Sequence, residues 1–312
     1  MAPSRGGVAL LMLFVASTAA SKVKFSPRNK FRISDARQRA VLAPFVVICT
    51  QRTGSQWVMK TLHKDTCDVD ASPEIFMSDF AWNHTVQREA LEVLFDTELA
   101  LRPELESLPR QVVHDMHAAR SYASPTAYGF KWMLNQGLVE LWEWFTELCQ
   151  ARGIRLVFLH RLDYLRMYIS YRHMHAVDIP HPANDADASK ITNVKLKLPT
   201  GDDLVGKLVE YESRFRRMDE LLADATTKGI PTMKVTYEHI SANHSLFSDV
   251  QRFLTEDLKG ETCVEAKREK KAKLDDDLTI RIHPDPPSAY VRNWPDVVDT
   301  LKDTKYARFV AR

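Results

Sequence analysis

The 312-residue sequence lacks several features that mark common classes of protein. Its formal charge is only +2, so it has no basic excess typical of a nucleic-acid partner, and a bound anion has to be held by a local site. It has four cysteines, and no two of them have the spacing of zinc ligands. It has no internal repeat and no Gly-x-x-x-x-Gly-Lys-Ser/Thr string, which disfavours an ordinary nucleotide triphosphatase.

The sequence also has no apolar run of the length that spans a bilayer. Its N-terminal apolar stretch, centred on residues 8–16, covers about 13 residues, and a spanning helix needs about 20. The stretch follows Arg5 and precedes small residues, an order typical of a secretory signal peptide cleaved near Ala19 or Ala20. We therefore expect residues 1–21 to be a signal peptide or a membrane-anchoring signal, and the chain to enter the secretory pathway, as a Golgi-lumenal or secreted protein. An organelle transit peptide is the alternative.

The cysteines and glycosylation motifs fit that compartment without proving it. The cysteines are Cys49, Cys67, Cys149 and Cys263, and one or two disulfides are compatible with a secretory route. Cys49 ends an apolar run, so it is expected to be buried as a small hydrophobic residue. Asn83 and Asn243 begin Asn-x-Ser/Thr glycosylation motifs.

The pattern of apolar residues predicts an α/β domain over residues 44–312, after a basic stem or lead-in at 22–43. Short apolar runs predict strands at 44–49, 111–113, 128–133, 154–159 and 232–237, and helical patterns begin near 55 and cover 84–108, 139–149, 163–175, 204–225, 243–254 and 294–309. Alternation of this kind predicts one domain with a central parallel sheet flanked by helices. The Pro-rich segment 178–203 is expected to be a long loop of the kind that forms lids.

A polar turn between the first predicted strand and its helix has the composition of an anion site. Backbone N–H groups and the helix dipole converge at such a turn. Arg52 adds a full positive charge, Thr53 and Ser55 add hydroxyl groups, and Gly54 allows close approach of the backbone. Ser55 is also a plausible N-cap of the helix. The turn therefore predicts a cradle for phosphate or sulfate.

The string from Thr50 to Trp57, Thr-Gln-Arg-Thr-Gly-Ser-Gln-Trp, resembles the 5′-phosphosulfate loop of sulfotransferases that use 3′-phosphoadenosine 5′-phosphosulfate (PAPS). Its Arg-Thr-Gly-Ser motif is most similar to that of the branch that includes bacterial carbohydrate and glycolipid sulfotransferases, whereas cytosolic members usually have lysine at the position of Arg52. A guanidinium can bind a phosphate or sulfonate through two parallel hydrogen bonds. The resemblance implies a P-loop-like loop after the first strand, with donor contacts from Gln51, Arg52, Thr53, Gly54, Ser55, Gln56 and Trp57.

Further matches follow along the chain. The resemblance implies that Arg161, at the end of the strand at 154–159, and Ser170, in the next helix, hold the donor's 3′-phosphate. They are nine residues apart, one more than in many members, and Arg166 and Arg172 are alternative contacts. Tyr237, in a string that resembles the family's Tyr-Glu-Asp-Leu, is a third donor contact. The 292–309 segment resembles the closing Asn-Trp helix. The basic run at 267–273 lies where the family has a donor-covering loop, and Lys271 is its candidate donor contact. The family's Arg-x-x-x-Lys-Gly string is missing, so the sequence leaves open which residue of this run contacts the donor.

Sulfuryl transfer needs a base for the proton of the acceptor hydroxyl and positive groups near the bridging oxygen. Glu74, in a Glu-aromatic context that resembles the proposed base of the carbohydrate branch, is the first candidate, and it is expected in a loop after the first helix. Lys131 matches a Gly-x-Lys element of that branch, and with Arg52 completes the predicted catalytic set. His114 and His117 are weaker candidates for the base.

The resemblance implies transfer of a sulfuryl group from PAPS to a hydroxyl of a carbohydrate or glycolipid, without a metal and without nucleic acid. Two alternatives stay open. A kinase-like transferase would use the same anion cradle with ATP and Mg²⁺. A non-catalytic protein of the same fold would bind the nucleotide or a glycan without turnover.

Overall fold

The computed structural model describes residues 43–65, 69–76, 83–95, 127–177, 190, 193–255 and 286–311. They form a five-stranded sheet with the strand order β2-β3-β1-β4-β5, in which every pairing is parallel. The strands are β1 (Ala43–Cys49), β2 (Val69–Glu74), β3 (Ala127–Met133), β4 (Arg155–His160) and β5 (Thr232–Thr236). The predicted α/β class with a central parallel sheet is confirmed.

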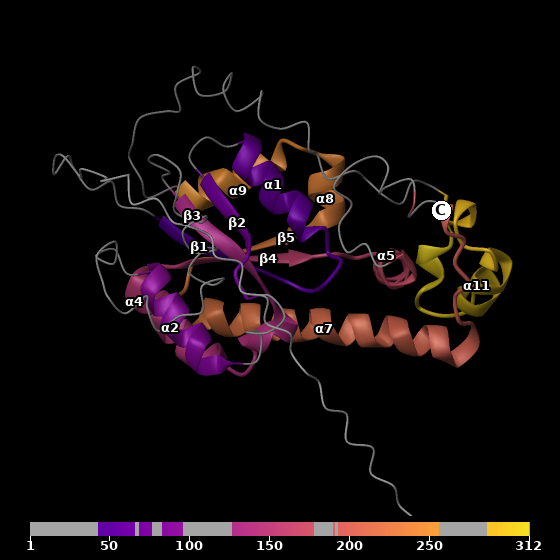
Figure 1. Ribbon diagram of the computed structural model, residues 1–312, viewed down its shortest axis with the longest axis horizontal. Helices are drawn as coiled ribbons and strands as arrows, with labels where there is room; N and C mark the ends of the chain where they lie inside the picture. Colours follow the sequence, from indigo (N-terminus) through magenta and orange to yellow (C-terminus); the bar gives the residue numbers. More distant parts are fainter. Residues whose placement is uncertain are drawn as a thin grey trace, which may run out of the picture. The chain divides into compact units, whose positions relative to one another are not determined.

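Helices cover both faces of this sheet (Figure 1). The α-helices are α1 (Ser55–Asp65), α2 (His84–Phe95), α4 (Trp142–Arg152), α5 (Tyr164–Val177), α7 (Gly201–Thr227), α8 (Tyr237–Ala242), α9 (Leu246–Thr255) and α11 (Trp294–Leu301). Three shorter elements are η3 (Leu134–Leu138), η4 (Pro287–Ala289) and η5 (Ala307–Phe309). Within these described ranges, none of the helices combines the length and apolar character needed to cross a membrane.

The central strand β1 explains why the sheet forms. All seven of its residues are buried, because β3 and β4 flank it and helices cover both of its faces. Val46 and Ile48 point to the core shared with α2, α4, α5 and α7, whereas Phe45 and Val47 point to the core shared with α1 and α9. Burial on both faces accounts for the continuous apolar run in the sequence.

Several predicted boundaries are wrong. The strand β2 was not expected at all, and Glu74 is its last residue rather than part of a loop. Its register on β3 shifts between Ser72 and Glu74, around Pro73, which is where an edge strand tolerates a proline. The helix expected from 139 begins at Trp142, because the chain first makes the turn η3, where Gly137 has a φ of 79°.

Towards the C-terminus, the helix expected over 294–309 ends at Leu301, and a separate 3₁₀ turn forms at Ala307–Phe309. The strand expected at 111–113, most of the loop at 178–203 and the end of the helix expected over 84–108 lie outside the described residues, as do the segments 1–21 and 22–42.

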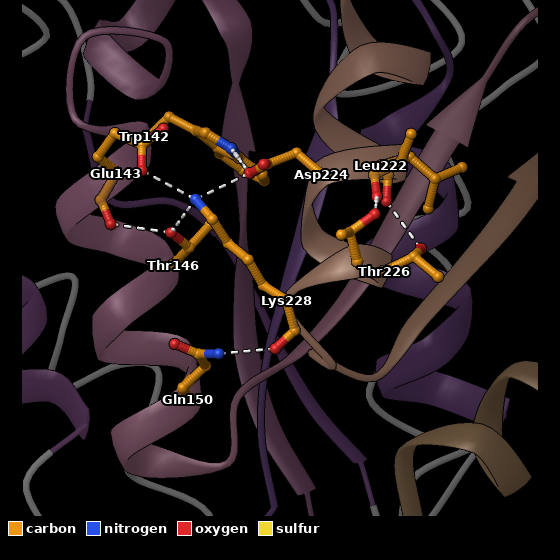
Figure 2. A network of polar contacts seen from close by, with 10 residues as sticks. Trp142, Glu143, Thr146, Gln150, Leu222, Asp224, Thr226 and Lys228 are labelled. Atoms are coloured by element: carbon orange, nitrogen blue, oxygen red, sulfur yellow. Dashed lines mark hydrogen bonds and ion pairs between the residues drawn. The ribbon is translucent and has the colours of Figure 1, made fainter.

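A polar network ties α4 to the end of α7 (Figure 2). The Lys228 ammonium contacts Glu143 at 2.9 Å, Asp224 at 2.9 Å and the Thr146 hydroxyl at 3.0 Å. The Trp142 indole N–H donates to the same Asp224 carboxylate at 2.7 Å. These contacts raise the pKa of Lys228, and the Lys228 and Trp142 donors lower the pKa of Asp224 in spite of its partial burial. The network fixes α7 where the chain turns into β5.

Candidate active site

The strand order places the candidate site at one edge of the sheet. From β1 the chain continues to β2 and β3 on one side, and then crosses to β4 and β5 on the other. Ligands of open parallel sheets bind outside the carboxyl ends of the strands at such a switch point. The segments that leave β1 and β4 meet there, and they carry the predicted donor contacts Arg52, Arg161 and Ser170.

The loop after β1 has an uncommon backbone. Arg52 has a φ of 66° and Gly54 a φ of 82°. Positive φ is unusual for a residue other than glycine, and such residues collect at ligand sites. The Thr53 hydroxyl donates to the Thr50 carbonyl at 2.9 Å, and the Val58 N–H donates to the Gly54 carbonyl at 3.1 Å. The turn is therefore closed by its own hydrogen bonds before α1 begins at Ser55, which is the first residue of the helix rather than its N-cap.

Gly54 faces Tyr237 across this turn. A Cβ atom on Gly54 would lie 2.4 Å from Cε2 of the Tyr237 ring, so no other side chain fits at position 54 without moving the ring. Trp57 packs edge-on against the same ring, with centroids 5.6 Å apart, and against Phe247 at 5.4 Å. Tyr237 thus lies beside the loop, and it begins α8 instead of ending β5.

Arg52 joins the loop to α5. Its Nε and Nη2 donate to the Ser170 hydroxyl at 2.9 and 2.8 Å, and Nη1 lies 3.9 Å from the Met174 sulfur. Burial, followed by the nearby Arg161 charge, lowers the pKa of Arg52, but a guanidinium stays charged at any physiological pH. Arg52, predicted to bind the 5′-phosphosulfate, and Ser170, predicted to bind the 3′-phosphate, are therefore in direct contact.

Arg161 supports the same loop. Its Nη1 donates to the Arg52 carbonyl at 3.0 Å, and its guanidinium lies 4.6 Å from the centroid of the Tyr237 ring. The alternative candidates are engaged elsewhere. Arg166 pairs with Asp163 at 3.2 Å, and Arg172 donates to the Tyr168 hydroxyl at 3.1 Å.

Glu74 and Lys131 form an ion pair near the loop. They are register partners on β2 and β3, and the Lys131 ammonium lies 2.6 Å from Glu74 Oε1. Their side chains are only 15% and 5% exposed. Burial raises the pKa of the Cys49 thiol, while Lys131 and hydrogen bonds with Ser55 and Thr53 oppose that shift and Glu74 adds to it. Cys49 is the last residue of β1 and comes directly before the loop.

Gln136 is a member of this group that the sequence analysis missed. Its side-chain amide donates to Glu74 Oε2 at 3.1 Å. The residue follows β3 in the turn η3 and is buried. Its position just beyond a strand end was the one available signal, and nothing in the local pattern of apolar residues distinguishes it.

Four buried polar atoms near the loop have no hydrogen-bond partner among the described residues: Thr50 Oγ1, Gln56 Oε1, Arg161 Nε and Thr236 Oγ1. Buried polar atoms are normally paired with protein, water or ligand, so their concentration here is compatible with a polar ligand. In the same described part of the chain, no three His, Cys, Asp or Glu side chains are grouped as metal ligands.

Other predicted residues are accounted for as follows. Cys49 and Cys149 are buried free thiols, which confirms the burial of Cys49. The remaining predicted residues lie outside the described residues: Lys271, His114, His117, Cys67 and Cys263.

Comparison with known proteins adds little. No family model matches the chain, and no curated protein matches its sequence. Among solved structures, it is similar to mouse sulfotransferase SULT7A1 complexed with PAP, with 11% sequence identity over 88% of this chain and 89% of that one. The TM-score is 0.33, which is too low for the likeness to support a conclusion about this chain.

Proposed function

We propose that the chain is a sulfotransferase that moves a sulfuryl group from PAPS to the hydroxyl group of an acceptor. The observation that carries this proposal is the link between the loop after β1 and Ser170 on α5, made by the two Arg52 hydrogen bonds of 2.9 and 2.8 Å. A donor with anionic groups at both its 5′ and 3′ positions needs positive charge and hydrogen-bond donors at two neighbouring points. Arg52 and Arg161 supply that charge at this edge.

The polar surroundings of the loop also favour an anionic donor. Arg161 Nε is a buried donor with no acceptor among the described residues, and a phosphate oxygen is an acceptor of the right kind. The loop adds backbone N–H groups at the start of α1, where the helix dipole favours negative charge. The proposed donor contacts are Gln51 to Trp57, Arg161, Ser170 and Tyr237, and the loop acts as the phosphosulfate-binding loop.

In the proposed reaction, the acceptor oxygen attacks sulfur, and an oxygen–sulfur bond forms as the bond from sulfur to the 5′-phosphate oxygen breaks. The hydroxyl proton passes to the Glu74 carboxylate, and the electron pair of the broken bond stays on the phosphate of the product nucleotide. Arg52 and the loop N–H groups stabilise the charge on that oxygen. Lys131 compensates the charge of Glu74 at 2.6 Å, and we propose that it lines the acceptor side.

The acceptor is proposed to be a carbohydrate or glycolipid hydroxyl. This part rests on the resemblance of the loop to the carbohydrate branch, and a shared fold does not fix a substrate. A transfer screen with labelled PAPS over sugars, glycolipids, tyrosyl peptides and small alcohols tests it, and preferred labelling of a peptide would contradict it.

The secretory route is likewise a proposal. It rests on the order of residues at 1–21, and the two asparagines of the glycosylation motifs, Asn83 and Asn243, are exposed. Expression of the full chain in a secretory host, followed by glycosidase treatment, tests the route. A mobility shift that vanishes in the double Asn→Gln variant supports it, whereas an unglycosylated protein in the cytosol or an organelle refutes it.

Thermal unfolding with and without nucleotide tests the donor assignment. A ligand at 100 times its Kd stabilises the native state by about 2.7 kcal/mol, so PAPS and PAP should both raise Tm. Arg52→Ala should abolish the shift, whereas Arg217→Ala, a matched change on the exposed face of α7, should leave it intact. Protection by ATP with Mg²⁺ in place of PAPS would favour the kinase-like alternative.

Turnover separates an enzyme from a binding protein. Glu74→Gln should abolish sulfuryl transfer but leave PAP binding in place, and Glu220→Gln, an exposed counterpart on α7, should have no effect. Donor binding with no transfer to any acceptor would instead identify a non-catalytic protein.

A further inference from the structure

The turn after β3 holds one amide against the carboxylate of Glu74. Gln136 Nε2 donates to Glu74 Oε2 at 3.1 Å, while the Lys131 ammonium is 2.6 Å from Oε1. The two carboxylate oxygens therefore have different partners, one neutral and one charged. Each oxygen has two lone pairs, so each keeps one to accept a further proton or hydrogen bond.

Gln136 is itself fixed at three other points. Its Oε1 accepts from the Met133 N–H at 3.0 Å, so its NH₂ group is the end that faces Glu74. Its backbone carbonyl accepts from the Trp132 indole N–H at 2.9 Å and from Gln87 Nε2 at 2.8 Å. The residue is only 4% exposed. Such a network determines the orientation of the amide, and through it the orientation of the carboxylate.

We propose that Gln136 is a positioning residue for Glu74, an inference that rests on the proposed function. Glu74 ends an edge strand that has one neighbour in the described sheet, so backbone pairing alone holds it loosely. The Gln136 amide fixes the plane of the carboxylate without adding charge. Among the residues that the structure describes, Lys131 and the Cys49 thiol are ionisable groups close to this carboxylate. A general base has to lie within hydrogen-bond reach of its proton, so rotation of the carboxylate would slow transfer.

Gln136→Met removes the amide at nearly constant length. We expect kcat to fall by roughly 10- to 100-fold, the effect of displacing a reacting group by about 1 Å, with an unchanged KM for PAPS. Gln87→Met is the matched control, because it removes a hydrogen bond to the Gln136 carbonyl and leaves the contact with Glu74 intact. An unchanged kcat in Gln136→Met, or an equal loss in Gln87→Met, overturns the proposal.

Gln136→Glu is the second variant, since it keeps an acceptor for the Met133 N–H. When the new carboxyl group is protonated it donates to Glu74 as the amide does, and when it is ionised it repels Glu74. We expect near-normal kcat/KM at low pH and a new loss of activity as pH rises, which the wild type and Gln136→Met do not show. If the Gln136 amide had only a structural role, Gln136→Glu would show no such loss of activity as pH rises.

The unfolding free energy of Gln136→Glu tests the contact without activity. A carboxyl group that binds its proton more tightly when folded contributes stability below its unfolded pKa and loses it as pH rises. Relative to wild type, Gln136→Glu should therefore lose stability on going from acid to neutral pH, and a pH-independent difference overturns the proposal. If the wild type transfers no sulfuryl group, the proposed function fails, and the positioning role fails with it. Active wild type with unaffected Gln136 variants refutes the positioning role alone.

Discussion

Replacing Gly54 by alanine should destabilise the protein through two separable effects. The first is backbone strain, because the φ of 82° suits glycine and costs an L-residue about 1–2 kcal/mol. The second is a collision, because the new Cβ would lie 2.4 Å from the Tyr237 ring and ordinary contact begins at 3.4 Å. The ring has to retreat by about 1 Å, at the expense of its contacts with Arg161 and Trp57.

The size of the second effect follows from those contacts. A cation–π contact is worth about 0.5–1 kcal/mol even at an exposed site and an aromatic pair about 0.5–1.5 kcal/mol, so the collision adds about 1–2.5 kcal/mol. Gly54→Ala should thus lower the free energy of unfolding by about 2–4.5 kcal/mol. In Gly54→Ala/Tyr237→Ala the ring is absent and only the strain is added, so the double variant should be about 1–2.5 kcal/mol more stable than the sum of the single changes predicts.

Urea unfolding followed by circular dichroism measures all four proteins, and an unchanged m-value shows that they unfold alike. Gly206→Ala is the control, because a Cβ there, in the second turn of α7, meets nothing within 4 Å, and alanine should stabilise that helix by about 0.5–1 kcal/mol. Strict additivity of the Gly54 and Tyr237 changes would refute the collision, and a neutral Gly54→Ala would refute both effects.

Three further outcomes are expected. Burial, helped by Lys234 and opposed by Asp219, lowers the pKa of His160 from 6.5 to about 4. As pH falls, the unfolded chain therefore binds this proton before the folded protein does. The free energy of unfolding should drop by on the order of 3 kcal/mol as pH falls from about 6.5 to about 4. Urea melts across that range should show the drop, and His160→Gln should remove it; an equal slope in the variant would contradict this. Ser170→Ala leaves the partly buried Arg52 guanidinium without this hydroxyl acceptor, so it should lower stability by about 1–3 kcal/mol. It should also weaken PAPS binding in calorimetry, and unchanged binding would count against a 3′-phosphate role. Lys228→Met should lower stability by no more than about 1 kcal/mol, an effect that should shrink at high salt because Glu143 is largely exposed and Asp224 is partly exposed; a larger, salt-independent loss would be evidence against that explanation.

Four of the five strands were predictable. The strands β1, β3 and β4 are buried along their whole length and appear as short runs rich in apolar residues. In β5 only Val235 is buried, and its β-branched residues are what made it recognisable as a strand. The fifth, β2, reads Val-Asp-Ala-Ser-Pro-Glu, and only its backbone pairing with β3 makes it a strand. That pairing depends on residues more than fifty positions away, so no local pattern reveals it.

The candidate site was likewise predictable only where its residues are close together in the sequence. The loop from Gln51 to Trp57 is contiguous, so its composition and spacing predicted an anion cradle. The contact of Arg52 with Ser170 spans 118 residues, and that of Gln136 with Glu74 spans 62. Such contacts arise from the strand order, which the sequence alone does not specify. The roles of these residues in donor binding and catalysis stay predictions.

The strand order also divides the site by timescale. The segments that carry Arg52 and Arg161 leave β1 and β4, which are inner strands with neighbours on both sides. Inner strands exchange their amide hydrogens only in rare, nearly global openings, whereas edge strands open locally and often. Glu74 ends the edge strand β2. Hydrogen exchange should thus be slow in β1 and β4, whose ends lead to Arg52 and Arg161, and faster in the backbone of β2, while the side chain of Glu74 keeps its contacts with Gln136 and Lys131. In the proposed function, the backbone beside the donor contacts would then open far less often than the strand that ends at the proposed base.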